Sequence, residues 1–399
     1  MPVPMALRSF SSVFVFCCTL ARFCSGDRVP PRYSVNLDTA AAHRWDHVVA
    51  AENATFFPAL RAILNNDKLR HVVALAKAVL GNDIEARRLF PMEMYEELSG
   101  ISRASGLEFA ELVIAGLVYD LFAAKKASLG ARACTGIVAQ SSKGDIFHGR
   151  NLDYDFTEEL ASITYVVDFA RNGSILYTAV TFGPSPVFNT AVRWGVFSVT
   201  QNQRDEGNIF GNYWSLIVQG RAGVFTRIRQ AVETVGSFDA AVDFFASVPL
   251  AAASYFVVGG TKPGEGAVVT RNRSAVVDVW RLKPQVGRWY VLETNYDHTS
   301  SVPKGDDRRR PLQRALNATG PDGLSGASLW NILSLTSVHP GDGERSPLNN
   351  ITVYSTVFQA SDPATFVTQV RTGRRPGAAE PEAGMVSLGG SLVDDLLVL

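Results

Sequence analysis

The residues best suited to chemistry are Cys134, Arg150 and Asp153, which fall within one short stretch of the chain. A thiolate is a nucleophile, a nearby guanidinium favours the ionised thiol, and a carboxylate can orient either group. Residues 137–139 and 146–148 have the composition of two strands, with turn residues between them. A hairpin of this length returns Arg150 and Asp153 to the start of its first strand. The sequence therefore predicts that a thiol, a guanidinium and a carboxylate meet at one point.

The elements that must position this hairpin form a helical block, a strand-rich block and a second helical block. Residues 38–122 have apolar side chains at helical spacing, with Asp38-Thr39 as the expected N-cap. The other predicted strands are 163–169, 175–182, 194–200, 255–258, 266–270, 275–280 and 289–294. Further helical patterns occupy 211–248, 309–318 and 326–336. This order predicts an α+β layered fold rather than a doubly wound sheet.

The charge balance argues against nucleic acid as a partner. Lys+Arg and Asp+Glu both total 38, and the formal net charge is +0. No basic excess is therefore present to neutralise phosphates. The hydrophobic content of 46% and charged content of 19% suit a globular protein with a sizeable core.

The pattern of residues 1–26 is typical of a secretory signal peptide. Arg8 precedes a short apolar run at 12–21, and the small residues Ser25-Gly26 follow it. The run is too short for a comfortable membrane span, and a retained signal anchor is the alternative.

The cysteines support the nucleophile hypothesis. Cys17, Cys18 and Cys24 lie in the predicted signal peptide, so the mature chain would keep Cys134 alone. A lone thiol is unusual in an oxidising compartment. A buried structural cysteine is the alternative, but the nearby arginine and aspartate favour a nucleophile.

The same compartment is indicated by five sequons for N-glycosylation. They begin at Asn53, Asn172, Asn272, Asn317 and Asn350.

Other kinds of site lack their motifs, and we predict neither a metal nor a cofactor. The chain has no glycine-rich dinucleotide motif after a strand and no phosphate-binding loop. His43 and His47 are four residues apart but lack the glutamate of a zinc protease motif. A Cys-His pair of the papain type is conceivable with His148 or His298, although the local papain signature is missing.

Cleavage between Ala133 and Cys134 would activate the thiol in a different way. The small and basic residues 123–133 form an expected exposed linker that suits such a cut. The new α-amine, with a reference pKa of ~7.7–8, would lie within reach of the sulfur and act as its base. Arg150 would favour the thiolate, and Asp153 would hold the amine or the arginine.

In several motifs that occur in the same order, the chain resembles the acid ceramidase family of N-terminal nucleophile hydrolases. The resemblance runs from about residue 30 to about residue 372. The motifs are Cys134–Gln140, His148–Tyr154, Gly259–Gly266, Thr270–Arg273, Glu293–His298, Asp306–Arg309 and Ala315–Gly320.

This resemblance implies a four-layer αββα sandwich and a lysosomal proenzyme, with a secreted form as an alternative. Self-cleavage before Cys134 would leave a heterodimer of a helical α-chain (27–133) and a catalytic β-chain (134–372), with a loose tail at 373–399. The implied substrates are fatty acyl ethanolamides, with ceramides as the alternative. The α-chain is also expected to contact a membrane surface.

The resemblance also implies roles for individual residues, matched by position. Cys134 is the nucleophile and its amine the base, while Arg150 and Asp153 line the reacting centre. Asn295 supplies an oxyanion donor through its side-chain amide, and Arg308 supports the site.

The chain departs from the family pattern at several places, among them Gly136, where serine is common, and Thr299, where a tryptophan is usual. Gln203 stands where the family has a glutamate, and a glutamine cannot exchange a proton; Glu206 is the nearby candidate to replace it. The segment 184–193 lacks the family's usual Gly-Tyr loop, which bears on the wall of the acyl pocket. These departures leave a third hypothesis, a lipid-binding relative without turnover.

Overall fold

The computed structural model describes residues 27–371 apart from residues 68, 81–82, 124–133, 337 and 340–342. The predicted signal peptide, the linker from residue 124 to Ala133 and the tail from residue 373 lie outside the described residues.

Helices fill the first part of the described chain. They are η1 (Ala41–His43), α1 (Asp46–Leu64), α2 (Arg70–Leu80), α3 (Asp83–Leu89), α4 (Met92–Ser105), α5 (Phe109–Gly116) and α6 (Val118–Phe122). The start of α5 is fixed by a capping box in which Glu108 and Glu111 each bind the other's backbone N–H. The predicted N-cap at Asp38-Thr39 is wrong, because these residues form a turn and the first helical residue follows Ala40.

The strands form two sheets. The eight-stranded sheet has the order β1-β4-β5-β6-β7-β8-β9-β10, and the five-stranded sheet has the order β11-β2-β3-β12-β13. The first sheet contains β1 (Arg32–Asn36), β4 (Thr164–Arg171), β5 (Ser174–Phe182), β6 (Thr190–Arg193), β7 (Phe197–Gln203), β8 (Ser254–Gly259), β9 (Gly266–Arg271) and β10 (Val276–Arg281). The second contains β2 (Thr135–Gln140), β3 (Ile146–Asp153), β11 (Tyr290–Glu293), β12 (Thr352–Gln359) and β13 (Asp362–Val370). All neighbours are antiparallel except β1 and β4, which run parallel.

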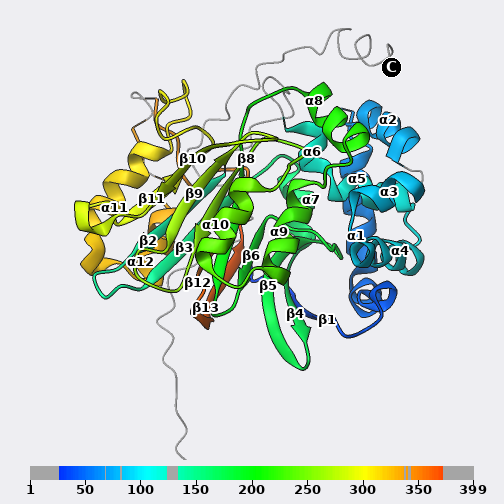
Figure 1. The fold of residues 1–399 in the computed structure, drawn as a ribbon, viewed down its shortest axis with the longest axis horizontal. Helices are drawn as coiled ribbons and strands as arrows, with labels where there is room; N and C mark the ends of the chain where they lie inside the picture. The colour runs from blue at the N-terminus through cyan, green and yellow to red at the C-terminus, as the bar shows by residue number, and fades with distance from the viewer. Residues whose placement is uncertain are drawn as a thin grey trace, which may run out of the picture.

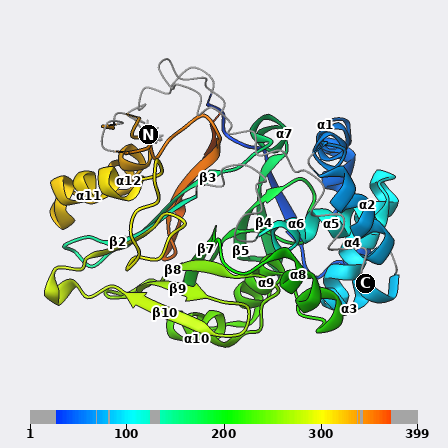
Figure 2. The same ribbon diagram turned by 90° about the horizontal axis from the view of Figure 1, so that it is seen from above.

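The two sheets lie face to face between two layers of helices (Figure 2). Helices α11 (Arg309–Gly323) and α12 (Gly326–Leu333) cover the five-stranded sheet, and α9 (Val224–Thr234) and α10 (Phe238–Ser247) cover the eight-stranded sheet, so the layers follow the predicted αββα order. Helices α1–α6 gather at one end of the sandwich (Figure 1). The remaining helices are α7 (Thr157–Ser162), α8 (Ile209–Tyr213), η2 (Trp214–Val218) and η3 (Pro284–Val286).

The sheets approach closely beside the predicted nucleophile. Val138 and Val291 of one sheet pack with Val257 of the other in a buried cluster. Gly136 makes this approach possible, because a Cβ there would lie 2.9 Å from a methyl group of Val257. Glycine at this position therefore fits the bulk of Val257 across the interface.

The hairpin of β12 and β13 is absent from the sequence-based prediction. Strand β12 is buried almost throughout, and it lies beside β3 with Thr356 opposite Arg150. It therefore forms part of the sheet that positions the predicted site. None of the helices in the described ranges is long and apolar enough to cross a bilayer.

Candidate active site

The pairing of β2 with β3 brings Cys134 and Arg150 together. Gly136 pairs with Arg150, so Cys134 lies two residues before the position opposite the guanidinium and on the same face of the sheet. Nη2 of Arg150 is 3.7 Å from Sγ of Cys134, and the backbone oxygen of Asp153 is 3.9 Å from the same sulfur. Both Cys134 and Arg150 are buried, at 4% and 0% exposure.

Arg150 is held by the neighbouring sheet. Its Nη1 donates to the backbone oxygen of Gln201 at 2.6 Å and to Oδ1 of Asn202 at 3.3 Å. Both acceptors belong to β7. The guanidinium therefore bridges the two sheets and keeps Nη2 turned toward the thiol.

Arg308 connects the nucleophile to the loop after β11. Its Nη1 donates to the backbone oxygen of Cys134 at 2.5 Å, and its Nη2 donates to Oδ1 of Asn295 at 3.1 Å. Both oxygens of Asp306 accept from the same guanidinium, at 2.9 and 3.1 Å. The guanidinium of Arg308 thus links Cys134, the expected nucleophile, to Asn295, the expected oxyanion donor.

Asn295 has an uncommon backbone conformation, with φ of 69°. Its N–H donates to a carboxylate oxygen of Glu293 at 2.6 Å, and its Nδ2 donates to the backbone oxygen of Gln203 at 2.9 Å. Glu293 also accepts a short hydrogen bond from the amide of Asn202. Asparagine tolerates the left-handed region better than most residues, and these contacts hold it there.

Asp153 is oriented by the hairpin that the sequence did not predict. Its two carboxylate oxygens accept from Thr352 at 2.6 Å and from Asn349 at 2.7 Å. In the uncleaved chain, a hydroxyl from the start of β12 and an amide from the loop before it therefore hold the carboxylate. The contact expected between Asp153 and the α-amine of Cys134 stays a prediction, because this amine forms only on cleavage.

Burial dominates the electrostatics of the site. It raises the pKa of the Cys134 thiol, and the opposing effects of Arg150 and Arg308 do not cancel it. Burial likewise raises the pKa of Asp153 to about 6 and that of Glu293 to about 7. In the uncleaved chain the thiol is therefore neutral near physiological pH and needs a base.

The raised pKa of Asp153 predicts a dependence of stability on pH. The folded chain binds this proton more tightly than the unfolded chain, so the contribution is fully present below the unfolded pKa of 3.8 and is lost as pH rises through about 6. Relative to Asp153→Asn, the free energy of unfolding should therefore fall by about 2–3 kcal/mol between acidic and neutral pH. Denaturant titrations of both forms carrying Cys134→Ala measure this difference. A constant difference across the range would contradict the assignment.

The two histidines considered as partners for the thiol are engaged elsewhere. The ring nitrogens of His148 lie 2.8 Å from Ser198 and 3.1 Å from Thr200, and burial with the nearby Arg150 lowers its pKa to about 3. The ring of His298 stacks on Trp280, with 4.4 Å between ring centroids. Neither arrangement supports a Cys-His pair of the papain type.

Gln203 enters the site through its backbone. Its oxygen binds Asn295, while its buried side chain donates to Asp205 at 2.5 Å. Glu206 follows in the loop after β7 and is half-buried. Residue-by-residue reasoning missed Asn202 and Thr352, because each acts only through a neighbour brought close by sheet pairing.

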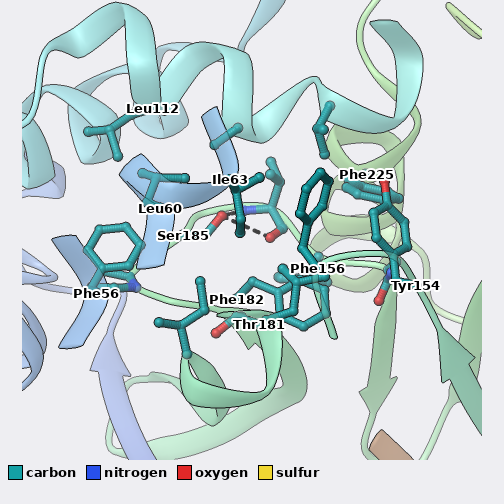
Figure 3. Close-up of a pocket in the computed structure, with 18 of the residues that line it drawn as sticks. Phe56, Leu60, Ile63, Leu112, Tyr154, Phe156, Thr181, Phe182, Ser185 and Phe225 are labelled. Carbon is teal, nitrogen blue, oxygen red and sulfur yellow. Dashed lines mark hydrogen bonds between the residues drawn. The ribbon is translucent and has the colours of Figure 1, made fainter. Parts of the chain in front are cut away.

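An apolar cavity is lined by residues of the helical segment and of the eight-stranded sheet (Figure 3). The space between its walls, with the open solvent at its mouth included, is about 1100 Å³. Tyr154 lines it and directly follows Asp153, whose oxygen contacts the thiol. Its walls come from α1, α5 and the segment after β5, and include Phe56, Leu60, Ile63, Leu112, Phe156, Phe182, Ser185, Phe188 and Phe225.

An αββα sandwich with a buried cysteine at the start of a central strand defines the class of N-terminal nucleophile hydrolases. The chain is 38% identical over 343 residues to the N-acylethanolamine-hydrolyzing acid amidase of Cavia porcellus. The matched region covers 86% of this chain and 91% of the amidase. The chain is therefore a member of the family formed by N-acylethanolamine-hydrolysing acid amidases and acid ceramidases.

Two further relatives agree with this assignment. The solved structure of the Caenorhabditis elegans ortholog of this amidase matches with a TM-score of 0.51 and 36% identity, over 58% of this chain and 95% of that chain. The acid ceramidase of Bos taurus is 30% identical over 86% of each chain. No protein-family model matches the chain.

Proposed function

We propose that this protein is a lysosomal amidase that hydrolyses fatty acyl ethanolamides after cleaving itself before Cys134. The observation that carries this proposal is the Cys134 thiol, which lies 3.7 Å from Arg150 and contacts Asp153, the residue directly before Tyr154 in the wall of the apolar cavity. The cavity suits an acyl chain, and the thiol suits attack on the amide carbon beyond it. The higher identity to the amidases than to acid ceramidase supports the ethanolamide over ceramide.

The reaction follows from the groups present. The free α-amine of Cys134 takes the thiol proton, and Sγ attacks the amide carbon. The second N–H of the Asn295 amide nitrogen is available to the developing oxyanion, since the first donates to Gln203. The C–N bond then breaks, the amine's proton passes to the leaving ethanolamine, and a thioester remains. Water attacks the thioester, which releases the fatty acid and restores the thiol.

The cavity wall includes the segment in which the chain departs from the family pattern. Ser185 accepts from the backbone N–H of Val187 at 3.3 Å and donates to its oxygen at 3.0 Å, and both residues line the cavity. The dashed lines beside Ser185 in Figure 3 mark these hydrogen bonds. Pro184 and Asn189 line the cavity as well. A different loop therefore still forms a wall for the acyl chain.

We propose that the two products of cleavage remain one particle. Strand β1 pairs with β4 over five residues, and Asp27 binds Arg371 at 2.6 Å. The amide of Asn212 also binds backbone oxygens at the end of α6. After cleavage at acidic pH, gel filtration should give one peak that contains both fragments in equal amounts. Two separate peaks would contradict this arrangement.

The secretory route is part of the proposal. All five predicted glycosylation sites have exposed asparagine side chains, as a glycan requires. We further propose that the helical α-chain approaches the membrane surface from which the substrate is taken.

Turnover of two substrates by the cleaved protein tests the proposal. Palmitoylethanolamide should be hydrolysed with a kcat/KM at least about tenfold above that for ceramide carrying the same acyl chain. A preference for ceramide would make the protein a ceramidase. Binding of either lipid without release of fatty acid would instead identify an inactive relative.

A further inference from the structure

Phe156 has a backbone conformation that phenylalanine rarely adopts. Its φ and ψ are 61° and 37°, in the left-handed region. Among the described residues other than glycine, only Asn172 and Asn295 also have positive φ, and asparagine is far more tolerant of it. The conformation costs roughly 1–2 kcal/mol for a residue with a Cβ. Strain of this kind is commonly retained where it serves a ligand site.

The neighbouring contacts explain how the strain is maintained. The N–H of Tyr154 donates to the oxygen of Ile351 at 2.9 Å, and Thr157 donates to the oxygen of Tyr154 at 2.8 Å. The oxygen of Phe156 accepts from the N–H of Leu160 at 2.8 Å and so begins α7. The backbone is thus fixed on both sides of Phe156, and the left-handed turn places its ring in the cavity.

The ring stands partway along the cavity. Figure 3 shows Phe156 between Tyr154 and Phe225 on one side and Leu60 and Ile63 of α1 on the other. Tyr154 adjoins the residue whose oxygen contacts the Cys134 thiol. We therefore place the end of the cavity nearest the sulfur at Tyr154, with Phe156 between that end and the part lined by α1.

We propose that Phe156 sets the upper limit of acyl chain length by standing across the route from the nucleophile to the part of the cavity lined by α1. This inference rests on the proposed function, because it concerns the acyl chain of the same substrate. The left-handed backbone at Phe156 fixes the direction of its side chain and so holds the bulky ring in the cavity.

The matched variants are Phe156→Gly, which removes both ring and strain, and Phe156→Asn, which removes the ring but suits the left-handed backbone. The wild-type and both variant enzymes are assayed with lauroyl-, palmitoyl- and arachidoylethanolamide. The ratio of kcat/KM for the arachidoyl over the palmitoyl substrate should rise at least about tenfold in both variants. Phe210→Leu, which changes a half-exposed phenylalanine outside the cavity wall, should leave this ratio within about twofold of that of the wild-type enzyme. Unchanged ratios in both Phe156 variants would overturn the inference.

A binding measurement separates failure of this inference from failure of the proposed function. Cys134→Ala protein, with and without Phe156→Gly, is titrated with lauric, palmitic and arachidic acids. The Phe156→Gly form should gain affinity for arachidic acid relative to palmitic acid by at least about tenfold. Absence of turnover in the wild-type chain would refute the amidase, whereas equal relative affinities with and without the ring would refute the role of Phe156.

Discussion

Replacing Cys134 with alanine should leave an uncut chain that releases no fatty acid from palmitoylethanolamide. The thiol is the sole nucleophile in the proposed reaction, and both self-cleavage and turnover depend on it. Loss of a nucleophile commonly lowers kcat by several powers of ten, so we expect a fall of at least about 10⁴-fold. Gel electrophoresis after acid treatment measures the cleavage, and release of labelled palmitate measures the turnover.

The matched control is Ser141→Ala, just after the end of the same strand. Ser141 is also a small polar residue at 5% exposure, and its hydroxyl binds Asp145 in the β2–β3 turn. This variant tests whether any loss of a buried polar contact in the hairpin has the same effect. It should cleave and turn over like the wild-type chain. Cleavage before residue 134 or turnover in Cys134→Ala would refute the mechanism.

Replacing Glu97 with alanine should destabilise the protein by about 3–5 kcal/mol. Glu97 on α4 and Arg229 on α9 are both fully buried, and two N–H groups of Arg229 bind the carboxylate at 2.6 and 2.7 Å. The Nε1 of Trp45 also donates to Glu97, at 2.8 Å. Without Glu97, the buried Arg229 keeps its ion pair with the partly exposed Glu233 but loses its fully buried partner, and breaking a buried pair carries a penalty of this size.

Glu93→Ala is the control for this prediction. Its side chain is 56% exposed and binds Arg44, which also contacts Glu97. An exposed ion pair contributes up to about 1 kcal/mol, so the loss should be small. Thermal unfolding of both variants measures the contrast. If both variants lost the same free energy of unfolding, the buried pair between Glu97 and Arg229 would not stabilise the contact between the helical segment and the sandwich.

The same pair should hold at acidic pH. Burial opposes ionisation of Glu97, yet Arg229 and the hydrogen bonds from Arg229, Trp45 and Arg44 outweigh it and lower the pKa of the carboxyl. Its stabilising contribution is therefore present above the pKa of the unfolded chain and is lost only as pH falls through the lower, folded value. The contact should therefore persist at the acidic pH of the proposed lysosomal compartment.

The sequence predicted the parts of the site that are local. The β2–β3 hairpin is encoded by two apolar runs and a turn. The number of residues between Cys134 and Arg150 therefore indicates that the hairpin brings the two side chains together. The succession of helical and strand patterns predicted an α+β layered fold, and the resemblance to the acid ceramidase family implied its αββα order. Asn295 and Arg308 were matched by position; in the structure Arg308 binds the backbone oxygen of Cys134 and also the side chain of Asn295.

Other parts depend on contacts that no local pattern encodes. Strand β12 lies beside β3 although some 200 residues separate Thr352 from Asp153, so nothing near Asp153 indicates its partner. The sequence also did not indicate that burial raises the pKa of the Cys134 thiol, because the nearby Arg150 alone would lower this pKa. The left-handed turn at Phe156 has no sequence signature, since phenylalanine is among the residues least expected there.

The most direct test of the account is the N-terminal sequence of the catalytic fragment. The purified full-length chain is incubated at acidic pH, and the larger product is sequenced and assayed for hydrolysis of palmitoylethanolamide. The account predicts a fragment that begins Cys134-Thr135-Gly136 and activity that rises in step with its formation. Full activity in an uncut chain, or in a product whose first residue is not Cys134, would contradict it.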